Sequence, residues 1–172
     1  PYERPPLSKA LLTRKDEPTL PSILKAGEVN DYGITLHCGS PVIKIDRPRH
    51  LVTLHNGDEF PYERLLIATG ATSRKLNIPG VKPDNVHYLR NFNEASALRS
   101  MLRPGSKLVV IGGGFIGLEI AASARDRGVD VTLLECAPRL LTRGVPAEIA
   151  NAIATRHRSA GVELRFAVAL QS

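Results

Sequence analysis

The sequence predicts an α/β protein in which a parallel β-sheet is joined to a small antiparallel β-meander. Residues 107–166 alternate strand, helix, strand, helix and strand, which is the order typical of a parallel sheet with helical crossovers. Residues 34–70 hold short apolar segments separated by turn residues, as in a meander. A Gly-Xaa-Gly-Xaa-Xaa-Gly pattern connects the first strand and helix of the alternating part.

The first half is expected to begin with a short helix over residues 5–14. Its prolines stand at the entrance, where a missing N–H costs little. Asn56 and Gly57 predict a tight type I′ hairpin turn, in which both central residues need positive φ. Short strands are expected over residues 34–37, 41–46 and 51–55, and a buried strand over 64–70.

The second half follows a linker over residues 78–90 that contains proline and glycine. A helix is expected over 91–102, with Asn93 as its N-cap. Gly161 is the expected stop of the last helix. The alternating part then consists of strands over 107–112, 129–135 and 162–166 and helices over 115–127 and 146–160.

Composition excludes several classes of protein. The 172 residues are 42% hydrophobic, but they contain no apolar run long enough to span a membrane and no secretory leader. The net charge is +6, yet Lys and Arg are dispersed and aromatics are few, so we expect no nucleic-acid partner. Cys38 and Cys136 fit neither a disulfide framework nor a metal site. The cytoplasm is the expected compartment.

The clearest chemical signal is the glycine pattern, formed by Gly112, Gly114 and Gly117. The first glycine permits a tight turn, the second lets the backbone approach a pyrophosphate, and the third lets the helix pack on the strand. The N–H groups at the helix N-terminus then bind the phosphates. Because the pattern follows a strand and opens a helix, it predicts a Rossmann-like dinucleotide site.

Glu135 ends the next strand, about twenty residues after the glycines. A carboxylate at that place accepts hydrogen bonds from the adenosine ribose and repels a 2′-phosphate. NAD(H) is therefore favoured over NADP(H), although Arg139 and Arg143 could each reach a phosphate. The alternative is that Glu135 is only a solvated strand end.

Five segments of the sequence are PYERPPLSK (1–9), LLIATGA (65–71), VHYLR (86–90), GGGFIGLE (112–119) and TLLECAPRLL (132–141). Together they resemble the FAD-dependent, NADH-using ferredoxin reductases of aromatic-ring dioxygenase and bacterial cytochrome P450 systems, with apoptosis-inducing factor as a more distant relative. The resemblance covers essentially the whole chain. It implies a Rossmann-like flavoprotein with two dinucleotide sites, one for FAD and one for NADH, truncated at both ends.

The resemblance also implies a division of labour along the chain. Residues 1–89 would belong to the FAD domain and residues 90–172 to an incomplete NADH domain. Contacts with FAD are implied for Arg4, Lys9, Val42, Ala68, Thr69, Gly70 and Arg90. Contacts with the nicotinamide nucleotide are implied for Gly112, Gly114, Phe115, Ile116, Gly117, Glu135 and Arg143.

Glu119 and Lys9 are the implied catalytic pair. In the family that the sequence resembles, this carboxylate and this lysine meet beside the reactive edge of the flavin ring, where the nicotinamide also stacks. The pair would orient the flavin, while the cofactors perform the redox chemistry. The alternatives are that Glu119 only interacts with its helix dipole and that Lys9 is a plain surface residue.

The segment around Lys9 lacks the redox cysteines that related disulfide reductases carry beside the flavin. Electrons are therefore expected to arrive as hydride and to leave singly, to a small acidic ferredoxin or rubredoxin-like carrier that the positive charge would steer. Two alternatives stay open. One is an NADH oxidase or monodehydroascorbate-type reductase, and the other is an NADH-responsive signalling flavoprotein resembling apoptosis-inducing factor. The oligomeric state is not predicted.

Overall fold

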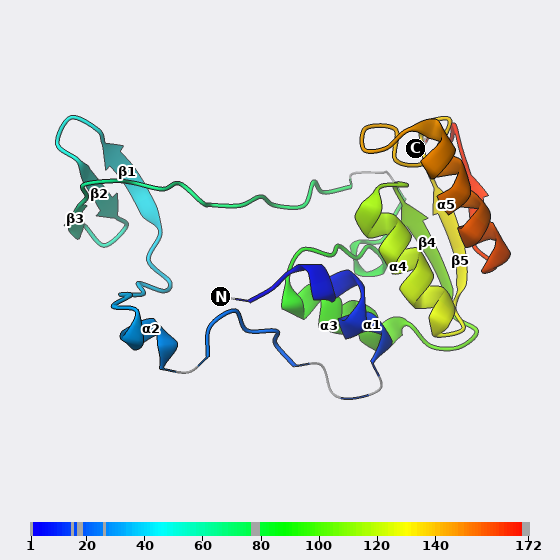
Figure 1. The fold of residues 1–172 in the computed structure, drawn as a ribbon, viewed down its shortest axis with the longest axis horizontal. Helices are drawn as coiled ribbons and strands as arrows, with labels where there is room; N and C mark the ends of the chain where they lie inside the picture. Colours follow the sequence, from blue (N-terminus) through cyan, green and yellow to red (C-terminus); the bar gives the residue numbers. More distant parts are fainter. Residues whose placement is uncertain (1, 15, 17–18, 26, 77–79, 170–172) are drawn as a thin grey trace. The chain divides into compact units, whose positions relative to one another are not determined.

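The computed structural model describes residues 2–14, 16, 19–25, 27–76 and 80–169. It contains one parallel and one antiparallel three-stranded sheet, which confirms the predicted α/β class (Figure 1). By packing, the chain forms two units: Leu24–Ala71 is one, and Pro1–Ile23 with Thr72–Ser172 is the other. We call them the meander unit and the parallel-sheet unit. The functional division at residue 89 stays a prediction.

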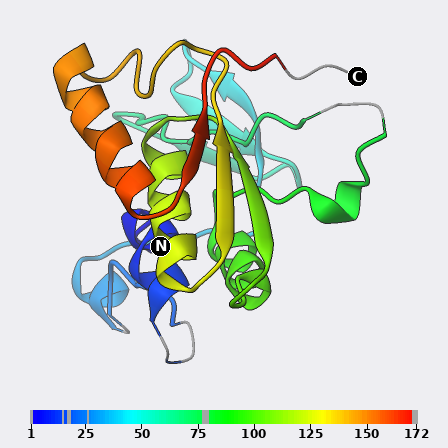
Figure 2. The same ribbon diagram turned by 90° about the vertical axis from the view of Figure 1, so that its right-hand side faces the viewer.

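The three predicted strands of the parallel sheet are β4 (Lys107–Ile111), β5 (Asp130–Leu134) and β6 (Glu163–Arg165), and they lie in the order β4-β5-β6. The predicted crossovers are α4 (Phe115–Asp126) and α5 (Ala147–Ser159). Figure 2 shows the three strands side by side, with both helices next to them. This is half of the doubly wound arrangement that dinucleotide-binding domains use.

Both crossover helices lie on the same face of this sheet. A ring nitrogen of His157 on α5 lies 3.2 Å from the carbonyl oxygen of Leu118 on α4. The core between the helices and the sheet includes Val131 and Leu133, which alternate along β5 with less buried residues, as strand geometry requires. Ala121 on α4 is fully buried, and its small side chain lets the helix approach the strands closely.

The N-terminal segment packs onto the parallel-sheet unit. The predicted helix over residues 5–14 is instead a 3₁₀ helix, η1 (Pro5–Ser8), followed by the short α1 (Ala10–Thr13). The break falls at Lys9, whose φ and ψ of −119° and −106° are not helical. Leu12 is fully buried in the core of the sheet. So short a segment has only a weak preference for one continuous helix, so the packing of Leu12 decides the conformation of the segment.

Two arginines fasten the end of this segment. The Arg127 guanidinium donates to the Leu12 carbonyl at 3.0 Å, and the Arg99 guanidinium donates to the Arg14 carbonyl at 2.9 Å. These carbonyls have no partner within so short a helix, because the last carbonyls of any helix lack one. The arginines therefore serve as C-terminal caps from other elements.

α3 (Phe92–Met101) precedes β4 and contacts α1. Its N-cap is Asn91, so the prediction of Asn93 is wrong. The Asn91 side chain accepts the Glu94 N–H at 2.9 Å, and the Glu94 carboxylate accepts the Asn91 N–H at 3.3 Å. This capping box requires an acidic residue three positions after the cap, which only Asn91 has. A 3₁₀ helix, η2 (Pro83–Asn85), lies in the preceding linker.

The meander unit contains the predicted antiparallel sheet, with the order β1 (Val42–Asp46), β2 (Leu51–Leu54) and β3 (Glu59–Pro61). Its hairpin turn differs from the predicted type I′. Gly57 has φ +93°, but Asn56 does not have positive φ. The Gly57 N–H bonds to the Leu54 carbonyl at 3.0 Å, which makes a three-residue loop with only the glycine left-handed.

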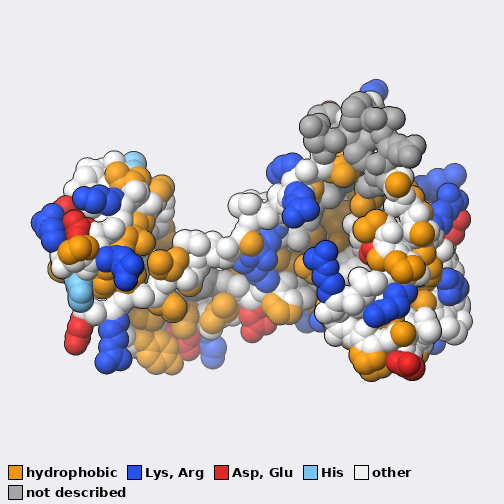
Figure 3. All heavy atoms as spheres, turned by 90° about the horizontal axis from the view of Figure 1, so that it is seen from above, with side chains coloured by type: hydrophobic (Ala, Val, Ile, Leu, Met, Phe, Trp, Pro, Cys, Tyr) orange, Lys and Arg blue, Asp and Glu red, His pale blue; other side chains and the backbone are white. Residues whose placement is uncertain are grey.

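Two predicted strands of the meander unit are absent. Residues 34–37 and 64–70 are described but form no strand, and a short helix, α2 (Glu28–Asp31), precedes the first of them. Leu66 and Ile67 are 86% and 65% exposed, so residues 64–70 are not buried either. Orange hydrophobic side chains stand at the surface of this unit in Figure 3. A strand needs hydrogen-bonding neighbours, and among the described residues no strand pairs with 64–70.

Candidate functional site

The glycine loop joins β4 to the N-terminus of α4. Gly112 has φ +107°, a conformation that side chains rarely adopt, so the chain turns sharply where the first glycine was predicted to allow it. Gly114 is the N-cap of α4 in extended conformation, and a Cβ there would meet only open space. Backbone N–H groups at this helix end are therefore accessible to an anionic ligand.

Gly117 lies against the loop itself. A Cβ on Gly117 would lie 2.1 Å from the Gly112 carbonyl oxygen and 3.3 Å from the Val110 side chain. Since no real carbon approaches so closely, only glycine lets the first turn of α4 pack at this depth. This is the packing role predicted for the third glycine.

Gly113 is a sterically restricted position of the loop that the sequence analysis did not single out. A Cβ there would lie 2.7 Å from the Leu140 side chain and 3.0 Å from a Glu135 carboxylate oxygen. The pattern treats this position as variable, because the restriction comes from a side chain more than twenty residues away. The run of three consecutive glycines was the only signal in the sequence.

Glu135 braces the loop from the end of β5. Its Oε2 accepts the Gly113 N–H at 2.6 Å, and its Oε1 accepts the Ala137 N–H at 2.8 Å and contacts the Cys136 thiol at 3.3 Å. Partial burial acts to raise the pKa of Glu135, but these backbone hydrogen bonds outweigh it and hold the pKa below its usual value. Glu135 is thus more than a solvated strand end, and its contact with a ribose stays a prediction.

The loop after β5 carries Arg139 and Arg143, the two arginines that could reach a phosphate. The Arg139 guanidinium donates to backbone carbonyls of its own loop, including Leu140 at 3.0 Å and Val145 at 3.2 Å. Arg139 is therefore engaged in holding the loop, whereas Arg143 is exposed.

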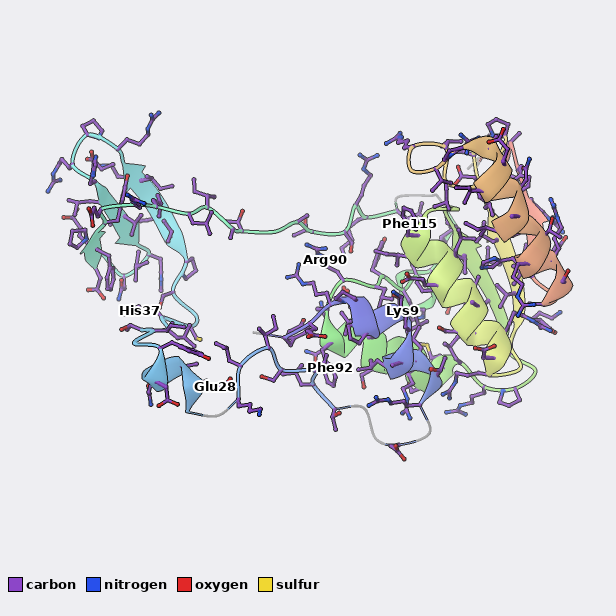
Figure 4. All side chains as sticks on the ribbon, in the orientation of Figure 1. Lys9, Glu28, His37, Arg90, Phe92 and Phe115 are labelled. Atoms are coloured by element: carbon purple, nitrogen blue, oxygen red, sulfur yellow. The ribbon has the colours of Figure 1, made fainter. Side chains whose placement is uncertain are left out.

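The start of α4 carries the other two residues predicted to contact the nicotinamide nucleotide. Phe115 and Ile116 are 56% and 52% exposed. Figure 4 shows Phe115 at this end of α4.

Lys9 and Glu119 lie together, as predicted. The Lys9 ammonium is 3.2 Å from Oε1 of Glu119, which faces the N-terminal segment from the second turn of α4. The Glu119 side chain is 31% exposed. An ion pair with this much exposure contributes at most about 1 kcal/mol to stability. The ion pair therefore matters mainly because the fold places the Lys9 ammonium beside the Glu119 carboxylate, and not because of the stability that it contributes.

Ser8 is a second partner of Glu119 that the sequence analysis missed. Its hydroxyl donates a hydrogen bond to Oε2 of Glu119 at 2.5 Å. The sequence signal for this contact was the position of Ser8 beside Lys9 in the PLSK segment. A serine in a short segment, however, more often bonds its own backbone.

The residues predicted to contact FAD are divided between the two units. Arg4 is exposed at the start of η1, and the Arg90 N–H donates to the Glu94 carboxylate at 2.7 Å just before α3. Val42 on β1 is 53% exposed. Ala68, Thr69 and Gly70 are also exposed and lie in the strandless segment of the meander unit. The joint role of these residues stays a prediction.

Among the described residues, no group of three or more His, Cys, Asp or Glu side chains is placed to hold a metal ion. The same part of the chain contains no helix with the length and hydrophobicity of a membrane span.

Comparison with protein families gives one assignment for nearly the whole chain. A family model described as pyridine nucleotide-disulphide oxidoreductase matches residues 1–171. The chain is 41% identical to rhodocoxin reductase of Rhodococcus erythropolis over 172 residues, which is 100% of this chain and 40% of that protein. It is 39% identical to the ferredoxin–NAD(+) reductase component of the p-cumate 2,3-dioxygenase system of Pseudomonas putida, covering 98% of this chain and 42% of that one.

Solved structures give a matching result. The ferredoxin reductase for the CYP199A2 system of Rhodopseudomonas palustris superposes with a TM-score of 0.90 at 38% identity, covering 100% of this chain and 42% of that chain. The present chain therefore spans about two fifths of the length of the proteins that it matches.

Proposed function

Because the chain belongs to the pyridine nucleotide-disulphide oxidoreductase family, we propose that its protein passes electrons from NADH through FAD to a small ferredoxin or rubredoxin-like carrier. The observation that carries this proposal is the ion pair between Lys9 of the N-terminal segment and Glu119 on α4, the helix that the glycine loop opens. Glu119 comes five residues after Gly114, which is about 7.5 Å along the helix axis. A dinucleotide held at the loop thus has the pair within reach of its reactive end.

The loop geometry supports binding of NADH. Gly114 leaves room at the N-terminus of α4, where the N–H groups and the helix dipole attract a pyrophosphate. Each carboxylate oxygen has two acceptor sites, so Oε2 of Glu135 can serve Gly113 and a ribose hydroxyl together. Glu135 would repel a 2′-phosphate, and Arg139 is engaged with its own loop, which favours NADH over NADPH.

FAD, when bound, supplies the chemistry that takes two electrons as hydride and returns them one at a time. The residues of this chain would bind FAD and orient its flavin ring. The Lys9 ammonium and the Glu119 carboxylate would fix a charged pair beside the ring, and Arg4 and Arg90 would add positive charge toward the flavin phosphates and ring. Phe115, exposed at the start of α4, would bound the space for the nicotinamide.

The proposed carrier follows from the relatives and from charge. One relative is named as the ferredoxin–NAD(+) reductase component of a dioxygenase system. The present chain has a net charge of +6, and Lys and Arg are spread over its visible surface (Figure 3), which suits steering of an acidic partner. Cys38 and Cys136 are both free thiols, in keeping with a reducing compartment, and we place the protein in the cytoplasm.

The proposal is tested with the full-length protein. Anaerobic titration with NADH should bleach a flavin band near roughly 450 nm. Steady-state turnover should then be faster with a ferredoxin-type acceptor than with oxygen. A colourless protein, or turnover with oxygen alone, would contradict the proposal.

A further inference from the structure

The two oxygens of the Glu119 carboxylate have partners of different character. Oε2 accepts a hydrogen bond from the Ser8 hydroxyl at 2.5 Å, and Oε1 lies 3.2 Å from the Lys9 ammonium. Ser8 is only 4% exposed, whereas the Lys9 side chain is 57% exposed. The neutral partner is thus enclosed by the protein, and the charged partner borders solvent.

Ser8 is also held through its backbone. Its carbonyl accepts a hydrogen bond from the Ser123 hydroxyl at 2.8 Å, and Ser123 is buried. Ser123 follows Glu119 by four residues on α4, so the two side chains lie on the same side of the helix. Ser8 therefore contacts α4 twice, through its hydroxyl at Glu119 and through its carbonyl at Ser123.

The packing around Ser8 allows it little movement. Leu7 precedes it and is 3% exposed, and Leu11, one turn later, is 6% exposed. Both side chains pack in one apolar cluster with Ala95 of α3. Lys9, in contrast, carries its charge on a long flexible chain, and an exposed ammonium exchanges its partner for water at little cost.

We propose that Ser8 is a positioning residue for Glu119. Its hydroxyl holds the carboxylate in one orientation whether or not Lys9 is paired with it. A hydroxyl that donates to an ionised oxygen at this distance makes one of the stronger and more directional hydrogen bonds in proteins. Lys9 is then the exchangeable partner, which can turn toward a bound cofactor while the carboxylate stays in place.

The role of Lys9 toward a cofactor rests on the proposed function, but the geometry of the carboxylate does not. The first experiment therefore compares crystal structures of the full-length protein with the substitutions Ser8→Ala and Lys9→Met. We expect Lys9→Met to leave Oε2 of Glu119 in contact with the Ser8 hydroxyl. We expect Ser8→Ala to let the carboxylate adopt a second side-chain conformation.

The opposite pattern, with the carboxylate displaced by Lys9→Met and unmoved by Ser8→Ala, would overturn the proposal. Ser123→Ala is the matched control, because it removes a hydrogen bond to the same segment without touching the carboxylate. We expect Glu119 to keep its conformation in that variant. If Ser8→Ala does not fold, Lys9→Met alone decides, since displacement of the carboxylate there contradicts the proposal.

Kinetics give a second readout. Ser8→Ala should lower kcat for NADH-driven carrier reduction about tenfold, because a misplaced orienting group slows the reacting state. The KM for NADH should stay within about twofold, because the nucleotide loop is untouched. Ser8→Thr, which restores a hydroxyl, should recover most of kcat. If the conformations behave as expected but the wild-type protein reduces no carrier, the positioning role stands and the proposed function is wrong. An unchanged kcat in Ser8→Ala, with carrier reduction intact, would overturn the role of the held carboxylate in turnover.

Discussion

The parallel-sheet unit and the meander unit differ in how completely their strands are paired. In the first, β4, β5 and β6 form one sheet, and the core includes the fully buried Leu133. In the second, residues 64–70 are as apolar as a buried strand, yet they are unpaired and exposed. Apolar sequence therefore makes a strand only where hydrogen-bonding neighbours are present.

Truncation of leucine in each unit tests this contrast most strongly. Leu133→Ala, at a fully buried position of β5, should lower the free energy of unfolding of this chain by about 2–5 kcal/mol because it leaves a cavity. Leu66→Ala, at an 86% exposed position, should change it by less than about 0.5 kcal/mol. Urea unfolding followed by circular dichroism measures both. Equal losses would mean that residues 64–70 are buried in solution.

A methyl group on the glycine loop sharpens the contrast inside the parallel-sheet unit. Gly117→Ala puts a carbon against the Gly112 carbonyl and should cost about 1–3 kcal/mol of stability as well as NADH binding. Gly114→Ala meets open space, so it should weaken NADH binding but leave the melting temperature close to that of the wild type. Calorimetry of binding and of unfolding separates the two effects. A stable Gly117→Ala variant would show that the loop is looser than described.

The cap of α3 allows a smaller test. Asn91→Ala removes the side chain that accepts the Glu94 N–H and should cost about 0.5–2 kcal/mol. Asn93→Ala, inside the first turn of the same helix, is the matched control and should have little effect. Thermal unfolding measures both variants, and a larger loss at Asn93 would restore the cap predicted from sequence.

Acid should produce the smallest effect. The pKa of Glu135 is lowered in the folded protein, so its hydrogen bonds contribute stability that is fully present above the ordinary value of 4.5. That contribution is lost as the pH falls through the lower, folded-state pKa. Glu135→Gln should therefore flatten the pH dependence of stability below pH 4.5. Identical acid profiles for the two proteins would show that Glu135 does not brace the loop.

Local signals in the sequence predicted much of the fold. The strands of the parallel sheet, β1 and β2 of the meander, the turn at Gly112, the close packing at Gly117 and the helices after the loop all follow from periodicity and spacing. The proximity of Lys9 and Glu119 came from resemblance, since no local rule joins residues so far apart. The N-cap of α3 is Asn91 and not the predicted Asn93, because Glu94 stands three positions after Asn91 and completes a capping box with it.

Other features depend on contacts that no short window contains. The left-handed conformation was assigned to both Asn56 and Gly57, but the loop is one residue longer than the motif assumes. Ser8 acquires its role only because η1 packs against α4. Gly113 is restricted by Leu140 and Glu135, which lie in the loop after β5. Each of these follows from tertiary packing rather than from neighbours in the sequence.

The arginine bonds to the N-terminal segment bear on how this protein can change over evolutionary time. Arg127 and Arg99 bind main-chain oxygens of Leu12 and Arg14, and every amino acid presents such an oxygen. The residues at the end of the segment can therefore be replaced by many amino acids without loss of these hydrogen bonds, provided that Leu12 is replaced only by another apolar residue. The two arginines are less replaceable, because only a guanidinium presents several hydrogen-bond donors in a fixed plane to these carbonyl oxygens.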